Sequence, residues 1–296
     1  MYKILEKRML TDTIFEMKIE APRVAKAALP GQFVIVKTTQ KGERVPLTIS
    51  DYDAEAGTVS IVTQAVGKST MELMTFEEGD SICDFVGPLG CPTDLCTMPE
   101  EELKQKNIIF IAGGVGAAPI YPQVKWLKAH GIDCDVIIGA RTKNLIILED
   151  QMREVAKNVY ISTDDGSYAF NGRVTDLLKK LVEEDGKQYN HAVAIGPMIM
   201  MKFAVMMTKG LGIPTVVSLN PIMVDGTGMC GACRVTIGDE VKFACVDGPE
   251  FDGFKVNFDE AMRRQTMYRT QEGRAKLKFE EGQTHKNGGC GCGGDK

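Results

Sequence analysis

The sequence predicts a β barrel followed by an α/β domain, with a cysteine-containing loop segment after it. Three observations predict this class. Short runs of alternating apolar and polar residues fill the first hundred positions, as in antiparallel strands. Beyond residue 106, apolar runs alternate with helix-length amphipathic segments, which is typical of a parallel sheet covered by helices. After residue 220, a C-x2-C pair and a third cysteine mark the loop segment.

Bulk composition indicates an ordinary globular protein of about two domains. The chain has 296 residues, of which 44% are hydrophobic and 25% charged. A net charge of −5 argues against binding to nucleic acid. No apolar run reaches the ~20 residues of a membrane span, and the N-terminus lacks the apolar core of a signal peptide. The nine cysteines are then expected to be thiols or metal ligands, in a cytoplasmic protein without membrane insertion.

The barrel is predicted over residues 1–99. Glycine, proline and aspartate separate its strand-like runs, and close spacing of such strands is typical of a small antiparallel barrel. The clearest runs are 13–20, 31–38 and 58–66. Only residues 69–76 look helical in this part of the chain.

The α/β domain is predicted over residues 106–219, after a polar joint near 99–106. Its right-handed crossovers should place helices on both faces of the sheet. The expected strands are 107–112, 134–140, 159–163, 191–195 and 214–219. The expected helices end near residue 130, span 148–157 and 174–184, and end near residue 210.

The loop segment, residues 220–258, contains a metal-ligand pattern with one cysteine missing. Cys230, Cys233 and Cys245 fit the last three positions of the plant-type [2Fe–2S] spacing, C-x4-C-x2-C…C. That spacing puts the first ligand at Asp225, and a carboxylate can ligate iron. The interleaved glycines favour a loop wrapped around a cluster. A tetrahedral zinc site is the alternative, and a redox dithiol is a weaker one because it leaves Cys245 without a role.

A C-terminal extension is expected over residues 259–296, with a disordered, polar and glycine-rich tail over 282–296. Cys290 and Cys292 lie in this tail, and we assign them no role. Four other cysteines are expected to be core thiols: Cys83, Cys91, Cys96 and Cys134.

A glycine-rich turn follows the first predicted parallel strand. Gly113, Gly114 and Gly116 would let the backbone approach a pyrophosphate, and the N-terminus of the next helix would offer unpaired N–H groups. The pattern is not G-x-G-x-x-G, because Ala-Ala-Pro follows at 117–119. A tight strand–helix turn without a ligand is the alternative.

Two barrel segments also suit an anion. Arg44-x-Pro46-x-Thr48 offers a guanidinium fork, and the stretch 67–70, Gly-Lys-Ser-Thr, offers N–H groups and hydroxyls at a helix start. Each alone is also typical of a surface turn. No paired carboxylates and no Ser-His-Asp set are recognisable, so we predict no catalytic residue.

Taken in order, these motifs and Gly196-Pro197 resemble the ferredoxin–NADP reductase superfamily over residues 1–258. The chain is similar to the electron-transfer subunits of dihydroorotate dehydrogenase. It is also similar to the small subunits of NADH-dependent reduced ferredoxin:NADP oxidoreductases, also called sulfide dehydrogenase FeS subunits. Asp225 favours this second group, since dihydroorotate-type subunits have four cluster cysteines. Ile195 stands where many relatives have a cysteine, which excludes a thiol assisting hydride transfer there.

The resemblance implies an FAD-binding barrel, a nicotinamide-binding α/β domain and a C-terminal [2Fe–2S] loop segment. The implied FAD residues are Arg44, Pro46, Leu47, Thr48, Val62, Thr63, Gln64, Gly67, Lys68, Ser69 and Thr70. The implied nicotinamide-nucleotide residues are Gly113, Gly114, Val115, Gly116, Ala118, Pro119, Gly196, Pro197 and Met198. The implied cluster ligands are Asp225, Cys230, Cys233 and Cys245.

The choice of nicotinamide depends on three further residues. Arg141, near the end of the second parallel strand, could accommodate a 2′-phosphate. Asp164 and Asp165 follow the third strand, where NADP-specific relatives carry Ser-Arg, and their charges would repel that phosphate. We therefore expect NAD(H).

The resemblance further implies a flavin and iron–sulfur oxidoreductase subunit that takes part in electron bifurcation. Its partner would be a larger subunit with FAD and [4Fe–4S] clusters that uses NADPH and ferredoxin, in a heterodimer or larger complex. One alternative is an electron-transfer subunit of a dihydroorotate, sulfide or polysulfide dehydrogenase. A less favoured alternative is a zinc-stabilised nucleotide-binding regulatory module without turnover.

Overall fold

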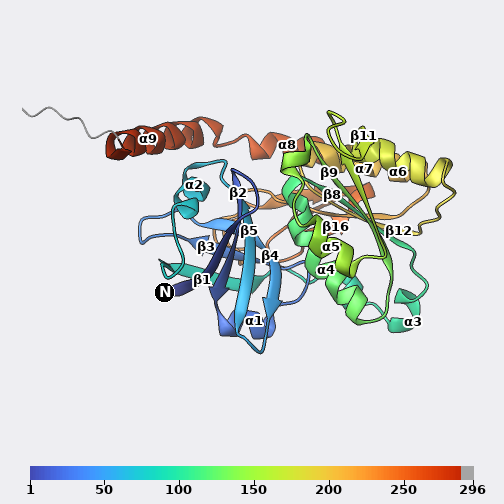
Figure 1. Ribbon diagram of the computed structural model, residues 1–296, viewed down its shortest axis with the longest axis horizontal. Helices are drawn as coiled ribbons and strands as arrows, with labels where there is room; N and C mark the ends of the chain where they lie inside the picture. Colours follow the sequence, from blue (N-terminus) through green and yellow to red (C-terminus); the bar gives the residue numbers. More distant parts are fainter. Residues whose placement is uncertain (288–296) are drawn as a thin grey trace, which may run out of the picture.

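The computed structural model describes residues 1–287 (Figure 1). Its N-terminal part is a nearly closed antiparallel sheet of seven strands in the order β6-β1-β2-β5-β4-β3-β7. The strands are β1 (Tyr2–Met9), β2 (Ile14–Glu20), β3 (Phe33–Lys37), β4 (Val45–Asp53), β5 (Thr58–Gln64), β6 (Ser81–Ile82) and β7 (Asp84–Leu89). Alternate side chains of each strand fill the barrel, as Phe15, Met17 and Ile19 of β2 do. The predicted barrel is confirmed.

Two helices accompany the barrel. One is α2 (Lys68–Met74), close to the predicted helical segment. The other, α1 (Pro22–Ala27), contradicts the expectation of a single helix in this region. It begins with a proline and buries Val24 and Ala25, but with six residues it is too short to display a helical period in the sequence.

The second sheet also has seven strands, in the order β11-β10-β9-β8-β12-β13-β16. All neighbours are parallel except β16, which is antiparallel to β13. The strands are β8 (Ile108–Gly113), β9 (Cys134–Ala140), β10 (Asn158–Thr163), β11 (Phe170–Asn171), β12 (His191–Ile195), β13 (Thr215–Ser218) and β16 (Glu250–Asp252). The predicted α/β architecture is confirmed.

Helices cover both faces of this sheet, each through an apolar stripe. On one face α4 (Ala117–Ala129) and α5 (Glu149–Val155) pack on alternate residues of β8 and β9. On the other face α6 (Val174–Glu183) and α7 (Met198–Gly210) pack on the intervening residues. A four-residue helix, α3 (Glu100–Leu103), lies in the expected joint between barrel and sheet. Short 3-10 turns are η1 (Asp94–Cys96), η2 (Gly114–Gly116), η3 (Lys143–Leu145) and η4 (Gly253–Lys255).

The side on which the chain adds strands to the sheet changes between β8 and β12. From β8 the chain adds β9, β10 and β11 on one side, and β12 and β13 are added on the other. Helices after β8 and β12 therefore leave toward opposite faces, which opens a crevice at the carboxyl ends of these two strands. Gly113 ends β8 and Ile195 ends β12, so the two predicted nucleotide motifs meet at this crevice.

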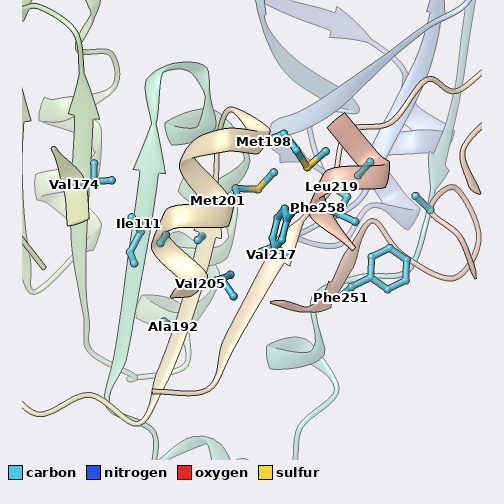
Figure 2. Close-up of a cluster of buried hydrophobic side chains, with 14 of the residues drawn as sticks. Ile111, Val174, Ala192, Met198, Met201, Val205, Val217, Leu219, Phe251 and Phe258 are labelled. Carbon is cyan, nitrogen blue, oxygen red and sulfur yellow. The ribbon is translucent and has the colours of Figure 1, made fainter. Parts of the chain in front are cut away.

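The segment after β13 is joined to the second sheet. It contains a hairpin, β14 (Arg234–Ile237) with β15 (Glu240–Phe243), and then β16, which pairs with β13. Figure 2 shows Phe251 of β16 and Phe258, the first residue of α8 (Phe258–Gln265), in the same cluster as Met201 and Val217. The loop segment and the α/β domain thus share one hydrophobic core.

The last helix, α9 (Arg269–Asn287), runs over the barrel and contacts α2 (Figure 1). The expected disorder over 282–296 is wrong for 282–287, which continue this helix, and residues 288–296 lie outside the described residues. The stretch just before, residues 275–281, consists mostly of strong helix formers and contains the Lys276–Glu280 pair one turn apart, so the helix formed there extends into 282–287. Within residues 1–287, no helix combines the length and the hydrophobicity that a membrane crossing requires.

Candidate functional site

A cavity of about 330 Å³ lies where the barrel meets the crevice of the second sheet. The barrel contributes Pro46 and Thr48 of β4 together with Val62 and Gln64 of β5. The second sheet contributes residues at and beyond the carboxyl ends of β8, β12 and β13, namely Gly113, Gly114, Val115, Gly116, Ala118, Pro119, Ile195, Gly196, Pro197, Ser218, Leu219 and Asn220. Segments far apart in the sequence thus form one slot with mostly apolar walls.

A second cavity of about 600 Å³ adjoins the first and shares Gln64, residues 113–115 and Pro197 with it. It extends along the carboxyl ends of β9 and β10 to the start of α6. Arg141, Asp164 and Arg173 lie along it. An elongated, partly charged cavity next to an apolar slot suits a nucleotide whose ring enters that slot.

The two strand ends approach so closely that glycine is required at the junction. A Cβ at Gly116 would lie 2.1 Å from the carbonyl oxygen of Ile195. A Cβ at Gly196 would lie 3.0 Å from the carbonyl oxygen of Gly113. The glycines predicted to bind a pyrophosphate therefore also have a packing role, because they let the ends of β8 and β12 touch.

Several of the predicted cofactor residues do not line either cavity: Arg44, Leu47, Thr63, Gly67, Lys68, Ser69, Thr70, Asp165 and Met198. Thr63 is buried and follows Val62 on a strand, so its side chain lies on the opposite face of β5. Met198 is a buried core residue. Asp165 accepts a hydrogen bond from the backbone N–H of Ser167, which holds its carboxylate in a turn of its own.

Residues 43 and 44, at the start of the first barrel segment expected to hold a diphosphate, and residues 67–70 of the second lie against each other outside these cavities. The hydroxyl of Ser69 is hydrogen-bonded to the carboxylate of Glu43, next to Arg44. The hydroxyl oxygen of Thr70 accepts hydrogen bonds from the N–H groups of Val66 and Gly67, at 3.0 and 3.1 Å. Thr70 therefore caps α2, a role that the sequence did not suggest for it.

Sequence reasoning missed several cavity residues. Arg173 immediately precedes α6, and Ile199 and Phe203 lie on α7, all along the larger cavity. Phe33, Met223 and Pro249 line the smaller one. Arg173 sits between a strand and a helix of the α/β series, a position that could have identified it. The other residues belong to elements brought in by the tertiary fold, and no local signal marks them.

A buried polar pair lies close to the smaller cavity. Gln123 of α4 donates a hydrogen bond of 2.6 Å from Nε2 to Oε1 of Glu250. Gln123 Oε1 and Glu250 Oε2 are buried and have no hydrogen-bond partner among the described residues. Burial raises the pKa of Glu250 to about 7, against the opposing effect of hydrogen bonds from Thr93 and Gln123.

In the loop segment, two of the predicted cluster ligands meet in the interior. Cys233 and Cys245 are both about 1% exposed, and their Sγ atoms are 3.3 Å apart. Burial raises the pKa of the Cys245 thiol to about 12, and the Cys233 thiol beside it adds to the effect. The backbone N–H of Gly228 faces the Cys245 sulfur and acts in the opposite direction, as N–H groups do around iron–sulfur clusters.

The other two predicted ligands form a second pair at the surface. Oδ2 of Asp225 accepts a 2.8 Å hydrogen bond from the N–H of Cys230, and Oδ1 accepts one of 3.0 Å from Thr227. These bonds, first the one from Thr227, lower the pKa of Asp225. Cys230 is exposed. Between residues 1 and 287, no three His, Cys, Asp or Glu side chains converge closely enough to hold a metal ion.

The donor set nevertheless fits a cluster. Two sulfurs already converge, a carboxylate kept ionised lies in the same loop, and Gly226, Gly228 and Gly231 have positive φ values of 77°, 82° and 65°. Such glycines turn backbone N–H groups toward a common centre, which suits the sulfides of a cluster. Iron would displace the thiol protons of the cysteines on binding.

One predicted core thiol is not in the core. Cys91 is exposed, and its Sγ donates a hydrogen bond of 3.2 Å to the carbonyl oxygen of Val246, next to Cys245. Cys134 is buried as expected, and Cys83 and Cys96 are partly buried. The error at Cys91 arises because this residue follows a barrel strand but packs against the loop segment.

Two family models match the chain in the places where these features lie. Residues 220–257 match the iron–sulfur cluster binding domain of dihydroorotate dehydrogenase B. Residues 110–206 match the oxidoreductase NAD-binding domain.

Relatives match over almost the whole chain. A Thermotoga maritima protein named as a homologue of the dihydroorotate dehydrogenase B (NAD(+)) electron transfer subunit is 46% identical, over 91% of this chain and 92% of the relative. The electron transfer subunit of Desulforamulus reducens is 33% identical, over 86% and 96%. The chain belongs to the family of dihydroorotate dehydrogenase B electron-transfer subunits and their homologues. A Clostridium beijerinckii protein, described as an uncharacterized protein in the adh 3′ region, is 66% identical over the full length of both chains.

Solved structures agree with this membership. A chain of the NADH-dependent reduced ferredoxin-NADP oxidoreductase, a structure concerned with flavin-based electron bifurcation, superposes with a TM-score of 0.86. It is 44% identical and covers 94% of this chain and 98% of its own. A ferredoxin NADP+ reductase from Neisseria gonorrhoeae, 18% identical with a TM-score of 0.58, shares the fold.

Family membership confirms the broad functional prediction. This member of the family is an oxidoreductase electron-transfer subunit with an NAD-binding domain and an iron–sulfur domain. The resemblance inferred from the motifs is confirmed as well. The match to an iron–sulfur domain at residues 220–257 favours a cluster over zinc.

Proposed function

We propose that this chain binds FAD, NAD(H) and a [2Fe–2S] cluster, and serves as the NADH-side subunit of a flavin-based electron-bifurcating oxidoreductase. The observation that carries the proposal is the combination of Asp225 in the first ligand position with the 44% identical match to the NADH-dependent reduced ferredoxin-NADP oxidoreductase. When bound, FAD supplies hydride exchange with the nicotinamide and the cluster supplies one-electron transfer.

The chain's own contribution would be to position these groups and to exclude water. The apolar slot lined by Pro46, Val62 and Pro197 suits a flat aromatic ring system. The backbone of residues 113–116 and the start of α4 suit a pyrophosphate, since α4 provides unpaired N–H groups and the positive end of a helix dipole. No acid or base from the protein is needed for hydride exchange, which agrees with the lack of a recognisable catalytic constellation.

One charge on the larger cavity, that of Asp164, favours NADH over NADPH. Asp164 lies on this cavity and is exposed, whereas Asp165 is turned toward Ser167. An ionised Asp164 can accept hydrogen bonds from ribose hydroxyls and would repel a 2′-phosphate. Arg141 and Arg173 on the same cavity would favour the phosphate, so the preference depends on which group lies nearest to the ribose.

The partner would be a larger subunit that contains FAD and [4Fe–4S] clusters and uses NADPH and ferredoxin. The experiment is anaerobic purification of the complex from cells, followed by an assay of NADPH formation. We expect NADPH to form only when NADH and reduced ferredoxin are both present. NADPH formation from either donor alone, or a partner without a second flavin and [4Fe–4S] clusters, would contradict bifurcation.

A second candidate is an electron-transfer subunit of a dihydroorotate dehydrogenase. The iron–sulfur domain match and relatives such as the 33% identical Desulforamulus reducens subunit favour it. In that case the purified complex would reduce NAD+ with dihydroorotate as the electron donor. Asp225 argues against this candidate, because the dihydroorotate-type subunits that the chain resembles have a cysteine there.

A further inference from the structure

Arg44 connects the barrel to the chain segment that carries the predicted aspartate ligand. Its Nε donates a hydrogen bond of 2.7 Å to the carbonyl oxygen of Val224. Its Nη2 donates one of 3.3 Å to the carbonyl oxygen of Asp225 itself. These bonds join residues 180 and 181 positions apart in the sequence. The guanidinium therefore fixes the backbone at Asp225 from the barrel side.

The same segment is also packed tightly onto the barrel. Gly226 has φ of +77°, and a Cβ there would lie 2.6 Å from Cδ1 of Ile35 and 2.7 Å from Cδ1 of Leu89. Ile35 belongs to β3 and Leu89 to β7, both barrel strands. The Asp225 segment thus packs on the barrel. Cys233 and Cys245, in contrast, are buried in the core that the loop segment shares with the second sheet.

Arg44 has capacity for a second partner. Both of its hydrogen bonds go to neutral carbonyl groups, and within residues 1–287 it forms no ion pair. The neighbouring Glu43 turns its carboxylate to Ser69 instead. A guanidinium has more N–H donors than these two bonds use, and its fork geometry suits a phosphate. Two residues further on, Pro46 reaches the apolar slot.

We propose that Arg44 couples flavin binding to cluster ligation, by holding the Asp225 segment through backbone carbonyls and the FAD diphosphate through its remaining N–H groups. This proposal rests on the proposed function, since it requires both cofactors. Because linkage is reciprocal, an assembled cluster tightens FAD binding by the same factor by which FAD stabilises the cluster. Arg44 is a positioning residue for Asp225 in this scheme.

The test measures FAD affinity of the full-length chain by flavin fluorescence, with the cluster present and after anaerobic removal of iron by a chelator. We expect the wild-type protein to bind FAD at least about 5-fold more tightly with the cluster present. In Arg44→Gln the ratio of FAD affinities with and without the cluster should fall to one. The EPR spectrum of the reduced cluster should respond to added FAD in the wild type and not in Arg44→Gln.

Two further variants separate coupling from general damage. Gly226→Ala should lower the ratio of FAD affinities with and without the cluster to one while Arg44 stays in place, because a Cβ there would clash with Ile35 and Leu89 and displace the Asp225 segment from the barrel. Arg8→Gln, which removes an arginine paired with Glu16 on the barrel surface, should retain the wild-type ratio. These controls also apply if Arg44→Gln does not fold.

The coupling proposal is overturned if the wild-type protein binds FAD equally well with and without the cluster, or if Arg44→Gln keeps the full ratio. A protein that binds both groups independently would leave the proposed function intact. A protein that binds neither group would overturn the proposed function together with the coupling.

Discussion

Asp225 combines two roles that a set of substitutions can separate. Its carboxylate holds the N–H groups of Thr227 and Cys230, so the side chain shapes the loop even without iron. If it is also an iron ligand, Asp225→Cys should retain a [2Fe–2S] cluster with a shifted midpoint potential, because thiolate and carboxylate donate charge differently. Asp225→Ala should leave an open iron site and a labile cluster. A redox titration monitored by EPR measures the midpoint potential of the cluster and the amount of cluster retained in each variant.

The matched control is Asp225→Asn, which keeps an oxygen acceptor for the loop but loses the charge. The loop should fold, and the cluster should be less stable than in the wild type. An unchanged potential in Asp225→Cys would show that Asp225 is not the ligand. The next candidates would then be a water or Asp247, whose carboxylate accepts a hydrogen bond of 2.6 Å from the N–H of Phe243 in the same loop segment.

Asp164 and Asp165 provide a matched pair for the nicotinamide preference. Asp164 lies on the larger cavity and Asp165 is held by Ser167 outside it. Asp164→Asn removes a charge repulsion with the 2′-phosphate worth about 1 kcal/mol, so it should improve binding of NADPH relative to NADH about 5-fold. Asp165→Asn should leave the ratio unchanged. Steady-state kinetics with both nucleotides measures the ratio, and equal effects of the two substitutions would refute the assignment.

At the residue scale, the sequence was most informative where a spacing reflects chemistry. The C-x4-C-x2-C pattern located Asp225, and glycines after an apolar run located the crevice. It was least informative where a residue acts across the tertiary fold. Arg44 bonds to Val224, Cys91 packs on Val246, and neither contact has a local signature.

Among the elements, the strand–turn–helix unit from β8 to α4 is the most constrained. Gly116 lies against the carbonyl oxygen of Ile195, so Gly116→Ala must push β12 and the turn apart. We expect a loss of about 1–3 kcal/mol in the free energy of unfolding and weaker NADH binding. Denaturant unfolding and nucleotide titration measure these two effects.

Gly210→Ala is the control, because a Cβ at this last residue of α7 meets no atom within 4 Å. It should leave stability equal or slightly higher, since alanine favours helix. If Gly116→Ala were as stable as Gly210→Ala, the close approach of β8 and β12 would not constrain the unit.

Periodicity predicted the long elements well and the short or joined ones poorly. The strands β9 and β12 have the bounds expected from their apolar runs. The six-residue α1 was missed, and residues 282–287 were expected to be disordered although they continue α9. The pairing of β16 with β13 could not be foreseen, because a three-residue strand depends on a partner that only the folded chain provides.

For the whole molecule, the important feature is that the barrel, the second sheet and the loop segment meet around one site. Glu250 lies at this junction: β16 carries it, Gln123 of α4 bonds to it, and Thr93 comes from the stretch that follows the barrel. Its ionised form is disfavoured by burial, with a contribution from the charge of Asp94.

This buried carboxyl predicts a pH dependence of stability. The pKa of Glu250 rises from 4.5 to about 7 on folding, so the folded state binds more protons between these values. The free energy of unfolding should therefore fall as the pH rises through this window, by on the order of 3 kcal/mol for this group. Glu250→Gln should remove this slope and be the more stable protein above pH 7, because its amide can pair with Gln123 Oε1.

The control for this prediction is Glu240→Gln. Glu240 is exposed, and its hydrogen bond with Lys242 lowers its pKa, so it titrates below that window. Thermal unfolding of the wild type and both variants from about pH 5 to about pH 8 measures how the stability of each depends on pH. A wild-type slope retained in Glu250→Gln would show that another group is responsible.

The fold class could be predicted from the sequence because each part has its own period, two in the barrel and about 3.6 in the helices. The cavity could not be predicted in this way, because residues such as Phe33, Met223 and Pro249 approach one another only when the barrel, the second sheet and the loop segment are assembled. The site therefore belongs to the whole molecule and to no single domain.

The central claim is that electrons from NADH pass through a flavin in this chain to a cluster ligated by Asp225 and three cysteines. An anaerobic titration of the purified chain with NADH, followed by visible absorbance and EPR, tests it most directly. We predict that flavin absorbance falls and that the EPR signal of a reduced [2Fe–2S] cluster appears in the same titration. A colourless, zinc-containing protein, or a coloured one that NADH does not reduce, would contradict the account.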